Sequence, residues 1–277
     1  MSKCKLQYRN LLFIGGGNIA GAVACGLVAS GTVPAEYVSV YDIDDSKFKK
    51  FNDLGISTFT NLCDAASNAE LIFLAVKPGI VSTVLKDLSV IDGLLDRATI
   101  VSFAAAVSVE HIEKSAEKPL SVIRTMPSTP ILVGEGVIAV SANERVNEVV
   151  FRDFCRMMSS IAHVAVVDES DLNPIIAVHG SSPAYVYLFI KAMLDAAEQQ
   201  GINKSVALPL ILKTIKGSVT MVEKSAESIE QLISNVASPN GTTLAALNSF
   251  EKDDFCGSVA RAMQACTDRA NEISKEL

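Results

Sequence analysis

The run Leu11-Leu-Phe-Ile-Gly-Gly-Gly-Asn-Ile-Ala20 decides how the first half of this chain folds. Its four leading apolar residues predict a buried strand, and the glycines that follow predict a tight turn into a helix. In the pattern G-x-G-x-x-A, Gly15 permits the turn, Gly17 lets the backbone approach a pyrophosphate, and Ala20 lets helix and strand pack closely. Asn18 and Ile19 open the helix, whose free N–H groups attract phosphate. We therefore expect a dinucleotide site at this turn.

Short apolar runs alternate with helical patterns as far as Val167. The runs that predict strands are Leu11–Ile14, Val38–Tyr41, Leu71–Val76, Thr99–Phe103, Val122–Thr125, Val137–Val140 and His163–Val167. The segments between them that predict helices are Asn18–Ser30, Asp45–Leu54, Pro78–Leu88, Val109–Ala116 and Glu144–Ser160. This alternation predicts an α/β Rossmann-type doubly wound sheet over residues 1–167.

The second predicted strand ends at Asp42, where a dinucleotide fold expects a carboxylate. An Asp at this position can accept both ribose hydroxyls of NAD and repels the extra phosphate of NADP. Its neighbours Asp44 and Asp45 also suit helix capping, and the nearest cation is Lys47. The sequence admits NADH or NADPH, and Asp42 favours NADH.

After Val167 helical patterns replace the strands, and an all-α domain is expected over residues 168–277. The patterns cover Pro183–Gln200, Lys204–Lys224, Ser228–Asn235 and Asp253–Lys275. The first half of Pro183–Gln200 is apolar on nearly all sides, and a segment this short offers little core of its own. We expect this surface to be covered by a second subunit, which makes the domain a dimerisation domain.

Composition excludes several classes of protein. The chain has 277 residues, 49% of them hydrophobic, and a net charge of −7, which disfavours nucleic-acid or anionic-membrane partners. No run approaches the roughly 20 apolar residues of a membrane span, and the glycines after Ile14 interrupt the one region that resembles a targeting segment. Six cysteines without a Cys-x-x-Cys pair suit a reducing cytoplasm. Three scattered histidines give no support for a metal site.

Four further segments narrow the interpretation. They are Ala75-Val-Lys-Pro78, Met126-Pro-Ser-Thr-Pro130, His179-Gly-Ser-Ser-Pro-Ala-Tyr185 and Ser238-Pro-Asn-Gly-Thr-Thr243. Their order and spacing resemble the Δ1-pyrroline-5-carboxylate reductase family over nearly the whole chain. The resemblance implies a Rossmann domain followed by a helical dimerisation domain, often assembled into rings of dimers. It also implies reduction of a cyclic imine, Δ1-pyrroline-5-carboxylate, to L-proline with NADH or NADPH, the last step of proline biosynthesis.

The same resemblance assigns site residues. Thr243 is implied to lie nearest the ring nitrogen and Lys77 near both nicotinamide and substrate, so these two are the candidate catalytic residues. The other substrate-binding candidates are Ser238, Gly241, Thr242 and Met126. The other cofactor-binding candidates outside the glycine turn and Asp42 are Ala75, Val76, Pro78, Ala104, Ala105 and Asn235. The residues from Ser238 to Thr243 also suit a carboxylate on general grounds, because they precede an apolar helix over Leu244–Phe250.

The chain departs from the family pattern at five positions. Ser128 replaces an asparagine, Ser182, Asn240 and Ala106 replace glycines, and Lys191 replaces a common glutamate. These changes leave open a reductase of a different cyclic imino acid. A β-hydroxyacid dehydrogenase shares the two-domain plan, but the sequence after Lys191 lacks the asparagine which that class needs. A non-catalytic dinucleotide-binding redox sensor is the third alternative, although it would not need Lys77, Ser238 and Thr243.

Overall fold

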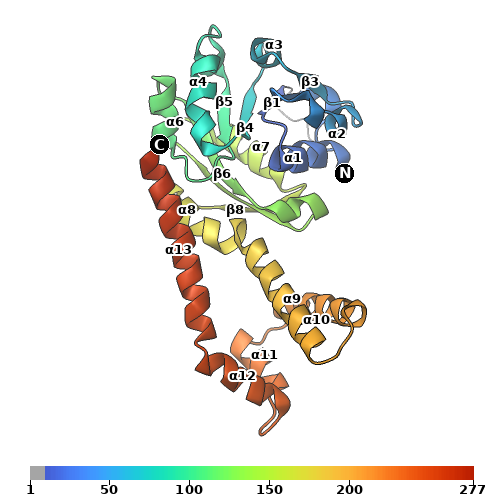
Figure 1. Cartoon of the computed structure of the whole chain (residues 1–277). Coiled ribbons are helices and arrows are strands. Elements are labelled where there is room, and N and C mark those ends of the chain that lie inside the picture. Colours follow the sequence, from blue (N-terminus) through green and yellow to red (C-terminus); the bar gives the residue numbers. More distant parts are fainter. Residues whose placement is uncertain (1–9) are drawn as a thin grey trace. The chain divides into compact units, whose positions relative to one another are not determined.

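The computed structural model describes residues 10–277, which form two compact units. The first unit contains the chain up to Ser181 together with Cys266–Leu277, and the second contains Ser182–Ala265. Helix α13 (Phe255–Glu276) therefore contributes its first turns to the second unit and its last turns to the first. Figure 1 shows the course of the chain and the labels of its helices and strands.

An eight-stranded sheet forms the core of the first unit, in the order β3-β2-β1-β4-β5-β6-β7-β8. The strands are β1 (Leu11–Ile14), β2 (Val38–Tyr41), β3 (Ser57–Phe59), β4 (Leu71–Leu74), β5 (Thr99–Ser102), β6 (Ser121–Pro127), β7 (Gly136–Ala142) and β8 (Ala162–Val166). Strand β1 pairs in parallel with β2 on one side and with β4 on the other, so the strand order reverses at β1. The expected Rossmann-type sheet is confirmed, and ligands of such sheets bind beyond the carboxyl ends of the strands at this point.

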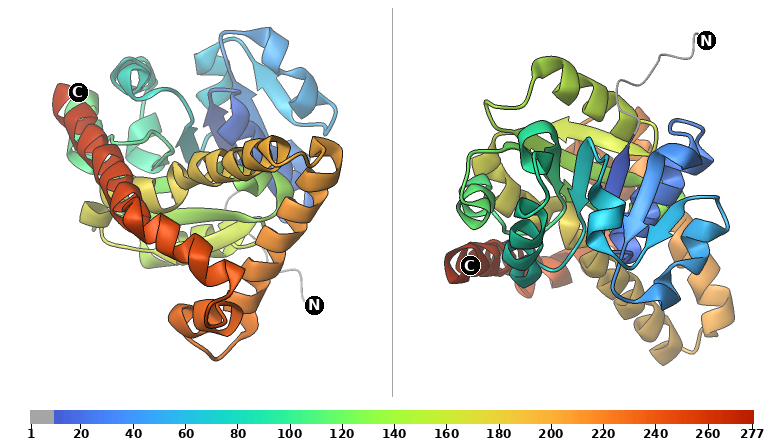
Figure 2. Two further views of the ribbon diagram at one scale, coloured as in Figure 1. Left: turned by 60° about the horizontal axis from the view of Figure 1, so that its bottom comes forward. Right: turned by 90° about the horizontal axis from the view of Figure 1, so that it is seen from above.

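Helices cover both faces of the sheet, which is why its central strands are apolar throughout (Figure 2). Alternate residues of β1 serve opposite faces: Phe13 belongs to one core and Leu12 to the other. In the first core, the rings of Phe13 and Phe73 stack with centroids 4.2 Å apart. The helices of this unit are α1 (Asn18–Ala29), α2 (Lys49–Asn52), α3 (Leu62–Ala66), α4 (Val81–Ser89), α5 (Leu94–Arg97), α6 (Val109–Ala116), α7 (Glu148–Met158) and α8 (Leu172–Ile175).

One strand pair departs from a purely parallel sheet, because β7 runs antiparallel to β6. The two strands are joined only by residues 128–135, and a parallel crossover needs about a dozen residues or more. The short edge strand β3 was not predicted, since Ser57–Phe59 carries no apolar run and no residue in it is buried.

The compact units divide the chain later than the boundary expected at Val167. Residues that follow Val167 pack on the sheet through Arg124 of β6. Its guanidinium lies 3.2 Å from the Glu169 carboxylate and donates to Asn173 Oδ1 at 2.7 Å. A π-helical turn over Ile176–Gly180 then leads out of the unit. Helical pattern alone could not reveal this attachment, because it depends on one buried arginine more than 40 residues away.

The second unit is built from helices, as expected. They are α9 (Ser182–Gln199), α10 (Lys204–Lys224), α11 (Ile229–Val236), α12 (Thr242–Lys252) and the start of α13. Many of its large apolar side chains are exposed, among them Leu188, Leu210 and Met221. Tyr185, Phe189 and Val259 are among the residues that line an apolar hollow of about 730 Å³ in this unit. Exposed apolar side chains gathered around an apolar hollow indicate a protein–protein interface.

Helix α10 is long and apolar enough to cross a membrane by length and composition alone. Its best window has a mean hydropathy of 1.3, and 11% of that window is buried within the chain. Lys213 and Lys216 interrupt the segment, so it contains no uniformly apolar run of that length. A helix that contributes to a subunit interface has the same appearance in a single chain.

Candidate active site

The glycine turn has the geometry that dinucleotide binding requires. Gly15 has φ of +102°, and a Cβ there would lie 2.6 Å from the Ala75 carbonyl oxygen. Its N–H donates to the Tyr41 carbonyl at 2.7 Å, which ties the turn to the end of β2. At Gly17, by contrast, a Cβ would meet nothing within 4 Å, so this glycine leaves open space rather than avoiding a clash. Gly17 is the N-cap of α1, and no side chain caps this helix start.

Asp42 stabilises the glycine turn by accepting hydrogen bonds. Gly16 N–H donates to its Oδ2 at 2.7 Å, Asp44 N–H donates to Oδ1 at 2.9 Å, and Lys47 Nζ lies 3.0 Å from both oxygens. Burial acts to raise the pKa of this carboxyl, but these hydrogen bonds and the charge of Lys47 outweigh it and lower the pKa below its usual value. Because Asp42 is only 6% exposed, its carboxylate organises the backbone of the glycine turn.

A hollow of about 420 Å³ opens beside this turn. Its lining residues are Gly16, Gly17, Asn18, Ser46, Lys47, Lys49, Lys50 and Asp53. Lys49 pairs with Asp53 at 3.0 Å, whereas Lys50 Nζ donates to the Gly17 carbonyl at 3.0 Å. Lys50 reaches this position over Gly21, where a Cβ would lie 2.7 Å from its ammonium. Lys50 has no carboxylate partner within residues 10–277, so a cation with unmatched charge borders the start of α1.

The next candidate site residues follow the carboxyl ends of β4 and β5. Ala75 N–H donates to the Ile14 carbonyl at 2.9 Å, which holds the segment after β4 against β1. Lys77 follows as an exposed residue, and Pro78 begins the short 3₁₀ turn Pro78–Ile80. After β5, Phe103 N–H donates to the Leu74 carbonyl at 3.0 Å, so the Ala104–Ala105 segment lies next to the segment that carries Lys77.

Met126 lies at the end of β6, and His179 holds it. His179 Nε2 donates to the Met126 carbonyl at 2.7 Å from within the π-helical turn. A Cβ at Gly180 would lie 2.4 Å from the Met126 methyl carbon, so the thioether packs directly on the backbone of that turn. π-Helical turns occur frequently at functional sites. His179 begins one of the family segments and was a candidate for lining the site, but its contact with Met126 could not be predicted from the sequence.

The remaining candidates belong to the second unit, around the start of α12. Gly241 is the N-cap, its N–H donates to the Ser238 carbonyl at 2.9 Å, and no side chain caps the helix. A Cβ at Gly241 would lie 2.4 Å from Ser238 Oγ, so a larger residue would displace this hydroxyl from its position. Thr242 is exposed and Thr243 half-buried in the first turn. Asn235 lies apart on α11, where its side-chain amide accepts from Gln231 and donates to Glu227.

The positions that depart from the family pattern have distinct environments. Asn240 and Ala106, which replace glycines, have φ of +59° and +64°, so both keep the backbone conformation that glycine adopts most easily. Ser128 is buried, and its Oγ accepts from Val137 N–H at 3.0 Å. Lys191 is exposed and pairs with Asp195 on the next turn of α9 at 2.5 Å.

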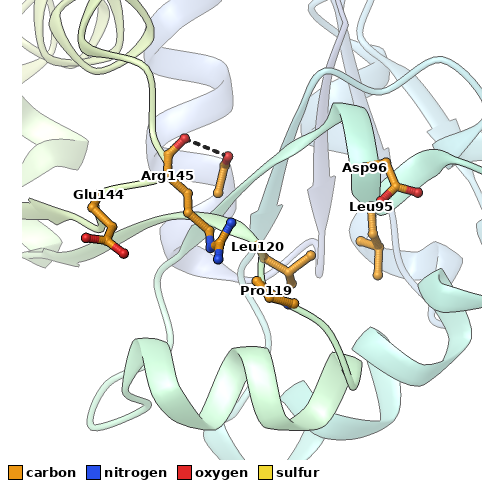
Figure 3. A pocket seen from close by; sticks show the side chains of 7 residues that line it. Leu95, Asp96, Pro119, Leu120, Glu144 and Arg145 are labelled. Atoms are coloured by element: carbon orange, nitrogen blue, oxygen red, sulfur yellow. Dashed lines mark hydrogen bonds between the residues drawn. The ribbon is translucent and has the colours of Figure 1, made fainter.

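A separate polar hollow of about 600 Å³ lies at the opposite edge of the sheet (Figure 3). It is lined by Leu95, Asp96, Pro119, Leu120, Ser121, Glu144 and Arg145. Ser121 begins β6, so this hollow lies at the amino end of that strand, away from the glycine turn. Within residues 10–277 no group of three or more His, Cys, Asp or Glu side chains is placed to hold a metal ion.

The sheet order, the glycine turn and its uncapped helix define the class, a protein with a Rossmann-type dinucleotide-binding fold. Residues 10–106 match the family model described as NADP oxidoreductase, coenzyme F420-dependent, and residues 169–273 match the model for pyrroline-5-carboxylate reductase dimerisation.

Whole-chain comparisons identify the family. Pyrroline-5-carboxylate reductase of Corynebacterium melassecola is 34% identical over 264 residues, covering 95% of this chain and 97% of the relative. That of Haemophilus influenzae is 35% identical over 271 residues, covering 97% and 98%. The chain belongs to the pyrroline-5-carboxylate reductase family. This membership decides against the β-hydroxyacid dehydrogenase alternative.

Solved structures agree with this assignment. The Plasmodium falciparum pyrroline carboxylate reductase with NADP bound has a TM-score of 0.89 at 29% identity, covering 98% of this chain and all of that one. The Coxiella burnetii pyrroline-5-carboxylate reductase has a TM-score of 0.86 at 32% identity, covering 97% and 99%. Prephenate dehydrogenase from A. aeolicus, at 14% identity and a TM-score of 0.55, shares the fold alone.

Proposed function

We propose that this chain reduces Δ1-pyrroline-5-carboxylate to L-proline with a nicotinamide dinucleotide as reductant. The observation that carries the proposal is the end-to-end match to named reductases, in a chain that keeps the glycine turn, Lys77 and the Ser238–Thr243 segment. The reduced nicotinamide supplies the hydride that is added to the C=N carbon of the protonated imine, whose nitrogen already carries the proton that proline keeps. The protein's contribution is then to bind and orient the substrate, which accounts for the lack of a strong acid among the candidate residues.

We propose that the glycine turn holds the pyrophosphate of the cofactor. Open space at Gly17 and the uncapped start of α1, with Asn18, Ile19 and Ala20 in its first turn, suit this role. Ala75, Val76, Pro78, Ala104 and Ala105 would border the nicotinamide half from the carboxyl ends of β4 and β5. Asn235 remains a prediction from the family pattern.

The choice between NADH and NADPH depends on the hollow beside the turn. From the sequence, Asp42 favoured NADH because its carboxylate can accept both ribose hydroxyls of NAD and repels the extra phosphate of NADP. In the structure its carboxylate already accepts from Gly16, Asp44 and Lys47, which weakens that support. The unmatched charge of Lys50 at this hollow suits the additional phosphate of NADPH, whereas the Ser46 hydroxyl already donates to Asp44 Oδ1 at 2.6 Å. We propose that the chain binds NADPH at least as tightly as NADH.

Replacing Lys50 by methionine tests the cofactor proposal. We expect the Kd for NADPH to rise about fivefold, because an exposed cation beside a phosphate contributes up to about 1 kcal/mol, while the Kd for NADH changes less than twofold. Fluorescence titration of both cofactors at low and high salt measures this, and the loss should shrink at high salt. Lys86→Met removes a charge from an exposed position on α4 and is the control. Equal losses for the two cofactors would contradict the assignment.

We propose that the start of α12 holds the substrate carboxylate. Ser238 and the backbone N–H groups of Gly241 and Thr242 would bind the anion at a helix N-terminus that no side chain caps. The Thr243 hydroxyl would hydrogen-bond the ring nitrogen. The roles of Met126 and Lys77 toward the substrate remain predictions from the family pattern.

We propose a homodimer formed through the second unit. Exposed apolar side chains on α9 and α10 support it. In a dimer the partner subunit would bury the apolar side chains of α10, so no membrane is required to cover them. Light scattering should give twice the 29.4 kDa chain mass, or a multiple of that dimer if rings form.

A cytoplasmic location is also proposed. Cys25, Cys63, Cys155, Cys256 and Cys266 are free thiols, and Cys4 lies outside the described residues.

A coupled absorbance assay tests the function. Oxidation of NADPH or NADH should depend on Δ1-pyrroline-5-carboxylate, and proline should form in equal amount. Six-membered piperideine carboxylates in the same assay test the alternative substrate that the departures at Ser128, Ser182 and Lys191 raised. Turnover of those rings without turnover of the five-membered ring would overturn the proposal. Binding of cofactor with no turnover of either ring would favour the redox sensor.

A further inference from the structure

The loop that leaves β5 holds a residue in an unfavourable conformation. Ala106 has φ of +64° and is 1% exposed, so it occupies the left-handed region in a tightly packed place. Residues with a Cβ enter this region at a cost that glycine avoids. The loop carries Ala104 and Ala105, which the proposed function places beside the cofactor. Something must therefore hold the loop in this conformation.

The last turns of α13 make the contacts that stabilise the loop in this conformation. Ser274 Oγ donates to the Ala106 carbonyl at 2.5 Å, across 168 residues of sequence. Ala106 also packs in an apolar cluster with Ile176 and Ala270, and Ala105 and Met126 border this cluster. All of these residues belong to the first unit, where α13 lies alongside α8 (Figure 1).

Ser274 is itself held by a network that ends at the far side of the same loop. Arg124 donates to Asn173 Oδ1 at 2.7 Å, and Asn173 Nδ2 donates to Ser274 Oγ at 3.1 Å. Arg124 also pairs with Glu169, whose Oε1 accepts from Val109 N–H at 2.8 Å, at the start of α6. The network thus ties the Ala106 carbonyl and the Val109 amide to one buried arginine.

We propose that Ser274 is a positioning residue for the cofactor. It holds the Ala104–Ala106 loop in the conformation that the dinucleotide needs, at a position where alanine stands in place of the family's glycine. The proposal rests on the proposed function, because only that function places this loop beside the nicotinamide. Ser274 does not touch substrate or cofactor in this account, and its effect passes through the backbone of Ala106.

A double-mutant cycle between Ser274 and Ala106 tests the proposal. Ser274→Ala should raise the Kd for NADPH about five- to tenfold, as expected for one lost hydrogen bond, and should leave the KM for the imine nearly unchanged. Ala106→Gly alone should have little effect. The double variant should regain most of the lost affinity, because glycine adopts the left-handed conformation without being held. Ser274→Thr keeps the hydroxyl and should stay within twofold of the starting protein.

Ser159→Ala is the matched control. Ser159 Oγ donates to the carbonyl four residues earlier, and Ser274 Oγ likewise lies 3.1 Å from the Ala270 carbonyl, but Ser159 has no hydrogen bond to the loop after β5. Circular dichroism and light scattering establish that each variant is folded and has the parent assembly. Equal affinity in Ser274→Ala and the parent would overturn the proposal, as would a double variant as weak as Ser274→Ala. NADPH titration decides this even if no imine is turned over, so its failure and that of the proposed function are separable.

Discussion

Gly15→Ala is expected to destabilise the first unit and to abolish cofactor binding. The new Cβ would lie 2.6 Å from the carbonyl oxygen and 3.0 Å from the carbonyl carbon of Ala75, at a backbone φ of +102°. The backbone of Ala75 cannot move away as a flexible side chain would, because its N–H donates to the Ile14 carbonyl. Left-handed strain and overpacking together should cost about 3 kcal/mol or more. Thermal unfolding and NADPH titration measure the two effects.

Gly17→Ala is the informative control for this variant. At Gly17 the backbone has φ of −69° and a Cβ would meet no atom within 4 Å, so stability should change by less than about 0.5 kcal/mol. Cofactor binding should nevertheless weaken at least tenfold, because the methyl group would occupy the space proposed for the pyrophosphate. Undiminished binding by Gly17→Ala would contradict the assignment of this turn to the phosphates. Undiminished stability of Gly15→Ala would contradict the close approach to Ala75.

Thr243→Val is expected to lower kcat/KM for the imine about a hundredfold, the cost of losing one well-placed hydrogen-bond group. Valine keeps the shape and branching of threonine, and the N–H groups at the start of α12 stay in place. The Kd for NADPH should therefore stay within twofold. Steady-state kinetics with varied imine, together with a cofactor titration, separate the two quantities.

Ser249→Ala provides the control on the same helix. Ser249 is exposed on the second half of α12, beyond the first turn that carries Thr243, and its loss should not alter kinetics. If Thr243→Val has the kinetics of the parent protein, Thr243 has no role at the ring nitrogen. A loss confined to NADPH binding would instead assign Thr243 to the cofactor.

The fold was predictable where local pattern determines structure. β1 is a fully buried apolar run that ends in glycine, and the structure has it over Leu11–Ile14, as predicted. The start of α1 at Asn18 was likewise predictable from the turn. β3 could not be predicted, because a three-residue edge strand needs no apolar run and depends on pairing with β2. The antiparallel β7 depends on a connection that is too short for a crossover, which apolar pattern does not report.

The site was predictable to a similar limit. Gly15 and Gly17 could be named as candidates because strand, turn and helix are adjacent in sequence, whereas Lys77 was assigned from the family resemblance. The hydrogen bond from Gly16 to Asp42 could not be anticipated, since it depends on how the turn folds back on β2. Lys50 lies 33 residues from the carbonyl it contacts, and Ser274 lies 168 residues from its partner. No spacing rule connects such residues, and only tertiary structure brings them together.

Transfer of deuterium from NADPH to proline is the most direct test that this chain reduces the imine. With NADPH that carries deuterium at nicotinamide C4 on the transferred face, we expect proline labelled at C5, the former C=N carbon, with one deuterium for each NADPH oxidised. Mass spectrometry and NMR of the isolated proline give both the amount and the position of the label. Proline without deuterium, or NADPH oxidation without formation of proline, would contradict the assignment of this chain as a pyrroline-5-carboxylate reductase.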